Sequence, residues 1–163
     1  MEDRCDVVRG IPARTGTGYV SLGTTTATSF TDTGASPNTA YLYKVRAINA
    51  GGSADSAPDL AMTVIFTDDP LVAGSTIIKA VHLAELRTAV NAVRALAGLA
   101  AATFTDAATL GVIVKAVHIN ELRTDLDQAM SALGLPTGGY TDTLTAGVVI
   151  KAIHFQEIRN RVK

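Results

Sequence analysis

Apolar residues in the second half of the chain recur at the spacing of an amphipathic helix. The recurring positions are Leu83, Leu86, Val90, Val93 and Ala97, then Ile119, Leu122, Leu126, Ala129 and Leu133, then Phe155, Ile158 and Val162. This periodicity predicts helices near residues 79–97, 115–133 and 151–162. Gly98 and Gly134 follow the first two helices, where a helix C-terminus favours glycine. Helices with one apolar stripe each are expected to bury those stripes together as a three-helix bundle.

A run of β-branched residues precedes each helical stripe, at residues 76–78, 112–114 and 148–150. Such side chains suit extended backbone better than the start of a helix. Each unit is therefore predicted to consist of a turn, a short extended and buried segment, and then a helix.

The first 66 residues carry a different pattern, rich in Thr, Ser, Gly and Val, with turn signals about every 8–12 residues. This pattern is typical of short antiparallel strands, which we expect at residues 18–22, 29–32, 40–49 and 61–66. The third strand alternates between two faces, with Tyr41, Tyr43, Val45 and Ala47 on one and Leu42, Lys44, Arg46 and Ile48 on the other. The chain is predicted to be α+β, with a β domain over residues 1–66 and a helical domain over residues 67–163.

The helical half contains one string, Lys-Ala-x-His-x-x-Glu-x-Arg, three times at a spacing of 36 residues. An aromatic residue followed by Thr-Asp stands upstream of each copy. The shared positions are Lys79, Lys115 and Lys151; His82, His118 and His154; Glu85, Glu121 and Glu157; Arg87, Arg123 and Arg159; and the triplets Phe66-Thr-Asp68, Phe104-Thr-Asp106 and Tyr140-Thr-Asp142. Four polar identities at fixed spacing in three copies identify an internal repeat.

Composition narrows the classes of function. The 163 residues are 47% apolar and 18% charged, which is typical of a globular protein. Residues 1–66 carry five basic and six acidic side chains and residues 67–163 carry nine of each. Because neither half is a polycation, we expect no nucleic-acid partner. Cys5 is the one cysteine, which excludes an intrachain disulfide and a cysteine metal cluster, and we expect no cofactor.

The sequence also bears on location. No run of 18 apolar residues occurs, so we expect no membrane insertion. The charged N-terminus lacks the apolar core of a signal peptide. Two interpretations follow, a cytosolic protein or a piece of a longer chain, and we favour the second.

The repeated His and Glu residues are the candidate site. They lie on one side of a helix and are good zinc ligands, so His82, His118 and His154 form a candidate metal site if the three helix starts converge. The competing interpretation is structural: each His sits at the edge of the buried stripe and bonds a loop carbonyl or the Thr-Asp turn of a neighbouring repeat. The Glu then suits the helix dipole in the first turn, and the Arg pairs with an acid on the next repeat. We favour the structural interpretation, because a catalytic site needs different residues in different roles.

Other candidate sites are weaker. Asp68 with Asp69 is the best candidate for calcium, but a turn or cap role is favoured, because calcium sites need more oxygens in a short loop. Cys5 is interpreted as an incidental thiol in a strand. The Gly16-Thr-Gly18 sequence is interpreted as a hairpin turn, because no helix follows it as a phosphate loop requires.

The β half resembles the second half of a fibronectin type III domain. The resemblance is carried by Phe30-Thr-Asp-Thr-Gly, Pro37-Asn-Thr-Ala-Tyr41 and Tyr43-Lys-Val-Arg-Ala-Ile-Asn-Ala-Gly-Gly-Ser53. It implies a partial antiparallel β-sandwich, in which Tyr41 is the corner tyrosine whose hydroxyl bonds back to the backbone. The two first strands of the family, including a core Trp, have no counterpart here. The open face is expected to be covered by the helical part or by another chain, unless the domain is truncated.

The whole chain also resembles the C-terminal regions of large secreted or surface proteins of soil bacteria, in which Lys-Ala-x-His-x-x-Glu-Leu-Arg helices follow fibronectin-like domains. The strings Lys79-Ala-Val-His-Leu-Ala-Glu-Leu-Arg87 and Lys115-Ala-Val-His-Ile-Asn-Glu-Leu-Arg123 carry this resemblance. It is similar, more weakly, to S-layer homology repeats. These resemblances imply an extracellular or cell-surface location and an accessory role.

Three functions follow as hypotheses. The first is a non-catalytic accessory module that mediates surface anchoring, adhesion, or binding of a cell-surface component, a polysaccharide or another protein chain. The second is a small hydrolase, a glycosidase or esterase, with Glu85, Glu121 and Glu157 as acids and a metal on the three histidines. The third is a homo-oligomer that closes the incomplete sandwich by donating a strand.

Overall fold

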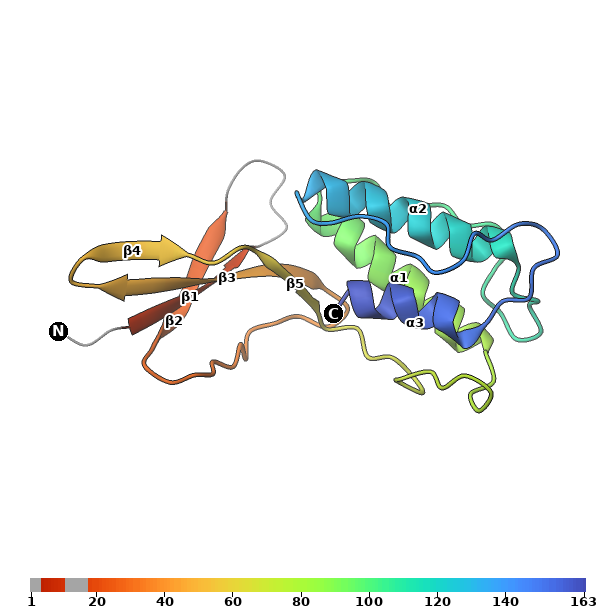
Figure 1. Ribbon diagram of the computed structural model, residues 1–163, viewed down its shortest axis with the longest axis horizontal. Coiled ribbons are helices and arrows are strands. Elements are labelled where there is room, and N and C mark those ends of the chain that lie inside the picture. Colours follow the sequence, from red (N-terminus) through yellow and green to blue (C-terminus); the bar gives the residue numbers. More distant parts are fainter. Residues whose placement is uncertain (1–3, 11–17) are drawn as a thin grey trace.

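A computed structural model describes residues 4–10 and 18–163 of the chain, and it contains both expected classes of secondary structure (Figure 1). The strands are β1 (Arg4–Gly10), β2 (Tyr19–Thr25), β3 (Ala40–Asn49), β4 (Gly52–Asp55) and β5 (Asp59–Met62). The helices are α1 (Ala80–Leu96), α2 (Ala116–Ala132) and α3 (Ala152–Arg161). The protein is therefore α+β, as the two hydrophobic patterns predicted.

The strands form one antiparallel sheet around β3. Strand β1 pairs with one edge of β3 and carries β2 on its far side, in the order β2-β1-β3-β4. The opposite edge of β3 pairs with β5 and then with β4, with Leu42 opposite Leu60 and Ala47 opposite Ala54. The ten residues of β3 thus hold the sheet together.

The expected strands at residues 18–22 and 40–49 are confirmed as parts of β2 and β3. The strand expected at residues 29–32 is wrong, because this segment is not paired: Asp32 instead accepts the N–H of Gly34 and the hydroxyl of Tyr43. The strand expected at residues 61–66 is displaced, since β5 covers Asp59–Met62 and the chain then leaves the sheet. Residues 16 and 17 of the expected hairpin turn lie outside the described residues.

The sandwich that the sequence suggested lacks its second layer in the described ranges 4–10 and 18–163, where all five strands belong to one sheet. One end of the sheet is covered instead by the helical part, because Ala40 and Leu60 are buried in the same core as the helices. Figure 1 shows the rest of the sheet extending away from the helices. There Val20 and Val45 stay 48% and 44% exposed, so part of the apolar surface of the sheet is open.

A lysine precedes each helix, and a glycine follows α1 and α2. Lysines with extended backbone precede the helices at Lys79, Lys115 and Lys151. Gly98 adopts a φ of 72°, and its N–H and that of Leu99 bond back to Ala95 and Arg94, as in a Schellman motif. Gly134 ends α2 in the same way, with a φ of 70°.

The apolar stripes of the three helices share one core. Its fully buried members include Leu83, Leu86, Val90 and Val93 of α1, Ile119, Leu122, Leu126 and Ala129 of α2, Phe155 and Ile158 of α3, and Val162 just after α3. Helices α1 and α2 run side by side and α3 packs across them (Figure 1). No helix in the described part of the chain is long and apolar enough to cross a membrane.

The β-branched runs before the helices are only half as buried as expected. Ile78, Val114 and Ile150 pack against the core, whereas Ile77, Ile113 and Val149 are exposed. Extended backbone explains the difference, since successive side chains point to opposite sides and only one side faces the helices. The prediction of a buried segment was therefore wrong for the middle residue of each run, and also for Val148.

Tyr41 provides a test of the local structure at the start of β3. Its hydroxyl accepts the backbone N–H of Ser36 at 2.9 Å, five residues upstream, as the resemblance implied. Replacing Tyr41 by Phe leaves that N–H without its partner while keeping the ring. We expect the free energy of unfolding to fall by about 1 kcal/mol, measured by urea denaturation. An unchanged unfolding midpoint would show that water replaces the hydroxyl at no cost.

Candidate functional site

Each histidine of the repeated string is buried at the third position of its helix. His82, His118 and His154 have 0% of their surface exposed. In each ring, Nδ1 accepts the backbone N–H of the preceding Lys79, Lys115 or Lys151, at 3.2, 3.2 and 3.1 Å. Since Nδ1 accepts, these contacts fit the neutral tautomer that carries its hydrogen on Nε2. The imidazole thus satisfies the amide of the N-cap residue that precedes the helix, as Glu or Gln does in a capping box.

The other ring nitrogen faces the Asp of the upstream Thr-Asp pair in the same repeat, so the expectation of a turn from a neighbouring repeat was wrong. The Nε2 to Oδ2 distances are 3.2 Å for His82 and Asp68, 3.2 Å for His118 and Asp106, and 2.9 Å for His154 and Asp142. Lys79, Lys115 and Lys151 also donate to these carboxylates, at 2.8, 2.8 and 3.2 Å. One carboxylate therefore ties each turn to the start of the helix that follows it.

These cationic and hydrogen-bonding partners favour the ionised form of the three acids. The lysine contact is the main cause that holds the pKa of Asp68 and of Asp106 below its usual value. For Asp142, the bond from His154 is the main cause of the lowered pKa, followed by Lys151. Each turn thus carries a carboxylate that stays charged well into acidic solution.

The glutamates bind the same turns from the next turn of helix. Glu85 accepts the N–H of Thr67 at 3.0 Å and also its hydroxyl. Glu121 and Glu157 accept the corresponding groups of Thr105 and Thr141. The expectation that Glu lies in the first helical turn was wrong, since the first turn of each helix holds no acid.

The arginines reach from one repeat to another. Arg87 donates to the carbonyls of Thr105 and Asp106, both at 2.7 Å. Arg123 donates to the carbonyl of Asp142 at 2.7 Å and to Glu157 at 3.1 Å. These contacts confirm for Arg123 the expected pairing with an acid on the next repeat. For Arg87 the partners are backbone oxygens of the next turn.

Arg159 makes the corresponding contacts with the first repeat. Its guanidinium donates to the carbonyl of Asp68 at 3.3 Å and to Glu85 at 3.1 Å. The side chain is fully buried, which lowers the pKa of Arg159 from its usual value. The partners lie 74 and 91 residues away in sequence. The arginine contacts therefore run from repeat 1 to 2, from 2 to 3 and from 3 to 1, and they close a ring of three repeats.

Each of these arginines also stacks on the aromatic residue of the turn that it binds. The guanidinium carbon lies 4.9 Å from the ring centre of Phe104 for Arg87, 4.5 Å from Tyr140 for Arg123, and 4.8 Å from Phe66 for Arg159. Burial raises the pKa of Tyr140 to about 12. The aromatic-Thr-Asp triplet is thus a receptor for an arginine from another repeat.

These geometries bear directly on the candidate metal and catalytic residues. Both ring nitrogens of His82, His118 and His154 are already bonded within their own repeats. Among residues 4–10 and 18–163, no three His, Cys, Asp or Glu side chains are grouped so that they could hold a metal ion. The three glutamates likewise bind three different turns: Glu85 binds Thr67, Glu121 binds Thr105 and Glu157 binds Thr141.

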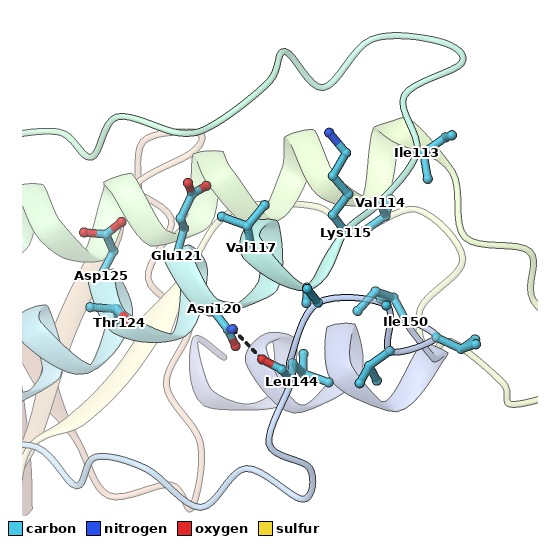
Figure 2. A pocket seen from close by; sticks show the side chains of 15 residues that line it. Ile113, Val114, Lys115, Val117, Asn120, Glu121, Thr124, Asp125, Leu144 and Ile150 are labelled. Carbon is cyan, nitrogen blue, oxygen red and sulfur yellow. Dashed lines mark hydrogen bonds between the residues drawn. The ribbon is translucent and has the colours of Figure 1, made fainter.

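An open groove lies between α2 and the segment that precedes α3 (Figure 2). Its volume is about 950 Å³. The exposed aliphatic side chains in its walls are Ile113, Val117, Val148 and Val149. The two walls are joined by a hydrogen bond of 2.8 Å from the Asn120 amide to the Leu144 carbonyl. No aromatic residue lines the groove, so it offers aliphatic contacts rather than a flat ring.

His118 provides a test of these contacts. Replacing it by Ala removes a buried ring and leaves the Lys115 N–H without its acceptor. We expect a loss of roughly 2–4 kcal/mol in the free energy of unfolding. His118→Gln should lose less, because a Gln at the third helical position can still accept that N–H. The midpoint of thermal unfolding should be insensitive to EDTA and to added Zn²⁺; a zinc-dependent rise would contradict the assignment.

The three ionised aspartates predict the pH dependence of stability. Because the pKa values of Asp68, Asp106 and Asp142 are lowered on folding, the unfolded chain takes up protons first as the pH falls. Their contribution is complete above about pH 5 and is lost progressively below about pH 4. Urea midpoints measured from pH 7 to 2.5 should show this fall. The triple Asp→Asn variant should be less stable at pH 7 and have a shallower pH dependence; an equal slope would contradict the prediction.

Comparison with known proteins gives one match of limited extent. A segment of 47 residues is 55% identical to a segment of exoglucanase B from Cellulomonas fimi. The match covers 29% of this chain and 4% of the length of that curated relative. No protein family matches the chain, and no solved structure matches it. The chain is thus similar over a short stretch to part of a bacterial exoglucanase.

Proposed function

We propose that this chain is a non-catalytic accessory module of a bacterial extracellular protein that degrades or binds carbohydrate. In this role it serves surface anchoring, adhesion, or binding of a polysaccharide or protein partner. The observation that carries the proposal is that all three copies of the polar string are used for contacts within the chain. The histidines and glutamates of the string are bonded within the chain in every copy, which leaves them poorly placed to act on a substrate.

The hydrolase alternative is not favoured by the geometry. Glycoside hydrolysis needs two carboxyl groups on either side of one bond, about 5–10 Å apart and open to the sugar. Here each glutamate accepts two donors from its own turn, and Glu85 and Glu157 bind an arginine as well. We therefore assign Glu85, Glu121 and Glu157, with the three histidines, to holding the repeats together.

The similarity to exoglucanase B supports the carbohydrate context and an extracellular location. The fibronectin type III resemblance and the helical repeats support an accessory role, and the hydrogen bond from Ser36 to Tyr41 agrees with the corner of that family. We propose that the sheet is a partial domain of this type and that the helices form a bundle of 36-residue repeats.

The surfaces of the chain differ in the partners that they suit. The faces of Phe66, Phe104 and Tyr140 are occupied by arginines, so these rings are not available for stacking on sugars. The aliphatic groove beside α2 and the open part of the sheet suit a protein partner, including a second copy of this chain. Phe30, 38% exposed in the segment between β2 and β3, is an aromatic side chain that a polysaccharide can reach.

Binding and turnover measurements test the proposal together. The purified chain is mixed with insoluble cellulose, with xylan and with bacterial cell-wall material, and its depletion from solution is measured against serum albumin. We expect depletion by at least one of these materials and no release of reducing sugar. Light scattering in the same buffer reports whether the chain is a homo-oligomer.

Glu121→Gln is the matched variant for the hydrolase alternative. The amide keeps the size of the side chain but weakens its bonds to Thr105, so the free energy of unfolding should fall by about 1 kcal/mol. Binding to the depleting material should be unchanged. Turnover of a glycoside or ester by the natural chain that disappears in this folded variant would overturn the non-catalytic assignment.

A further inference from the structure

The three helices of the ring are alike in their arginines but differ at two neighbouring positions. One turn before the arginine stand Ala84 in α1, Asn120 in α2 and Gln156 in α3. One turn after it stand Asn91, Asp127 and Lys163. The turns also differ, because the residue after Thr-Asp is Asp69, Ala107 or Thr143. These positions distinguish repeats that otherwise dock through the same contact.

At the contact between repeats 3 and 1, the distinguishing residues Asp69, Gln156 and Lys163 all take part. The Asp69 carboxylate forms an ion pair with Lys163 and accepts the Gln156 amide at 3.3 Å. The Gln156 carbonyl in turn accepts the backbone N–H of Leu71 at 2.8 Å. The Lys163 contact is also the main cause of the lowered pKa of Asp69. At the contact of Arg123 the equivalent residue Asn120 also bonds the next turn, through the Leu144 carbonyl, but Thr143 stands there in place of Asp69 and offers no carboxylate.

Helices α1 and α2 have no cation at the position equivalent to Lys163 that could pair with Asp69 in the turn of repeat 1. Asn91 of α1 accepts the N–H of Ala102 at 2.8 Å, where no charge is present. Asp127 of α2 accepts the N–H of Gly138 and the hydroxyl of Tyr140, and it pairs with Arg161. If α2 took the place of α3, Asp127 would face Asp69, and two carboxylates would repel each other.

We propose that Asp69, Gln156 and Lys163 are the specificity determinants that direct α3 to the turn of repeat 1, which contains Phe66, Thr67 and Asp68. The shared Arg–aromatic contact gives affinity between any two successive repeats, and the determinants give the order. The turn of repeat 1 therefore accepts a helix with Gln at this position and Lys just beyond its end, which is α3, and this contact closes the ring.

Charge reversal in the full chain tests the assignment. Lys163→Asp places the acid of α2 opposite Asp69, and Asp69→Lys places two cations together. Each single variant should increase the unfolding equilibrium constant by about two- to fivefold and raise amide hydrogen exchange in α3. The double variant, Asp69→Lys with Lys163→Asp, should recover part of this loss, because the carboxylate of Asp69 also pairs with Arg159 at 3.8 Å and that pair stays lost. Single variants that unfold like the natural chain, or a double variant whose losses simply add, would overturn the proposal.

A matched control uses the equivalent position of the first helix. Asn91→Asp adds the same acid where the facing turn has Ala107 in place of Asp69, and it keeps an acceptor for Ala102. We expect amide exchange in α3 to stay as in the natural chain. If Asn91→Asp raised exchange in α3 as much as Lys163→Asp does, the effect would be general destabilisation and the determinants would have no role.

Discussion

The helical part of this protein depends on one interaction, the insertion of an arginine from each helix into the aromatic-Thr-Asp turn of another repeat. Each guanidinium stacks on an aromatic ring and donates to backbone carbonyls of the same turn. Arg159 is buried completely, and a buried cation is tolerated only when its charge and hydrogen bonds are compensated. The turns must therefore present their carbonyls in one direction, which fixes where the acids and histidines can lie.

The histidine and glutamate of the string prepare the turns for this insertion. The glutamate accepts hydrogen bonds from the Thr of its turn. The imidazole bonds both the Asp carboxylate and the amide of the N-cap lysine. Both contacts are local in sequence, spanning 18 residues or fewer. Local bonds thus shape each receptor, and the arginines then connect receptors that are distant along the chain. The string resembles an active site, but its histidine and glutamate shape the turns and its arginine connects the repeats.

Sequence patterns predicted the local features of this structure well and the distant ones poorly. The stripes that include Leu86 and Leu122 placed the helices, and Gly98 and Gly134 their ends, because these signals act within one or two turns. The same local pattern failed at Ile77 and Ile113, since β-branched residues favour extended backbone whether or not they are buried. The strand expected at residues 29–32 failed because Asp32 bonds locally instead of pairing with the sheet.

The candidate site was predicted in its residues but not in its partners. The recurrence of His82, Glu85 and Arg87 showed that these residues matter in every copy. The Thr-Asp turn was expected as a histidine partner in a neighbouring repeat, whereas each imidazole binds the Asp of its own repeat. The closure through Arg159 could not be read from the sequence, because its partners Asp68 and Glu85 are set by the packing of α3 on α1.

The placement of Lys163 against Asp69 has a mechanical consequence. The chain enters the helical part beside Phe66 and reaches residue 163 at the same place, so the two points are neighbours in space. Tension applied between these points would act first on the few contacts that join α3 to the first turn, which would separate one after another. The interiors of α1 and α2 would carry load only after that junction had opened.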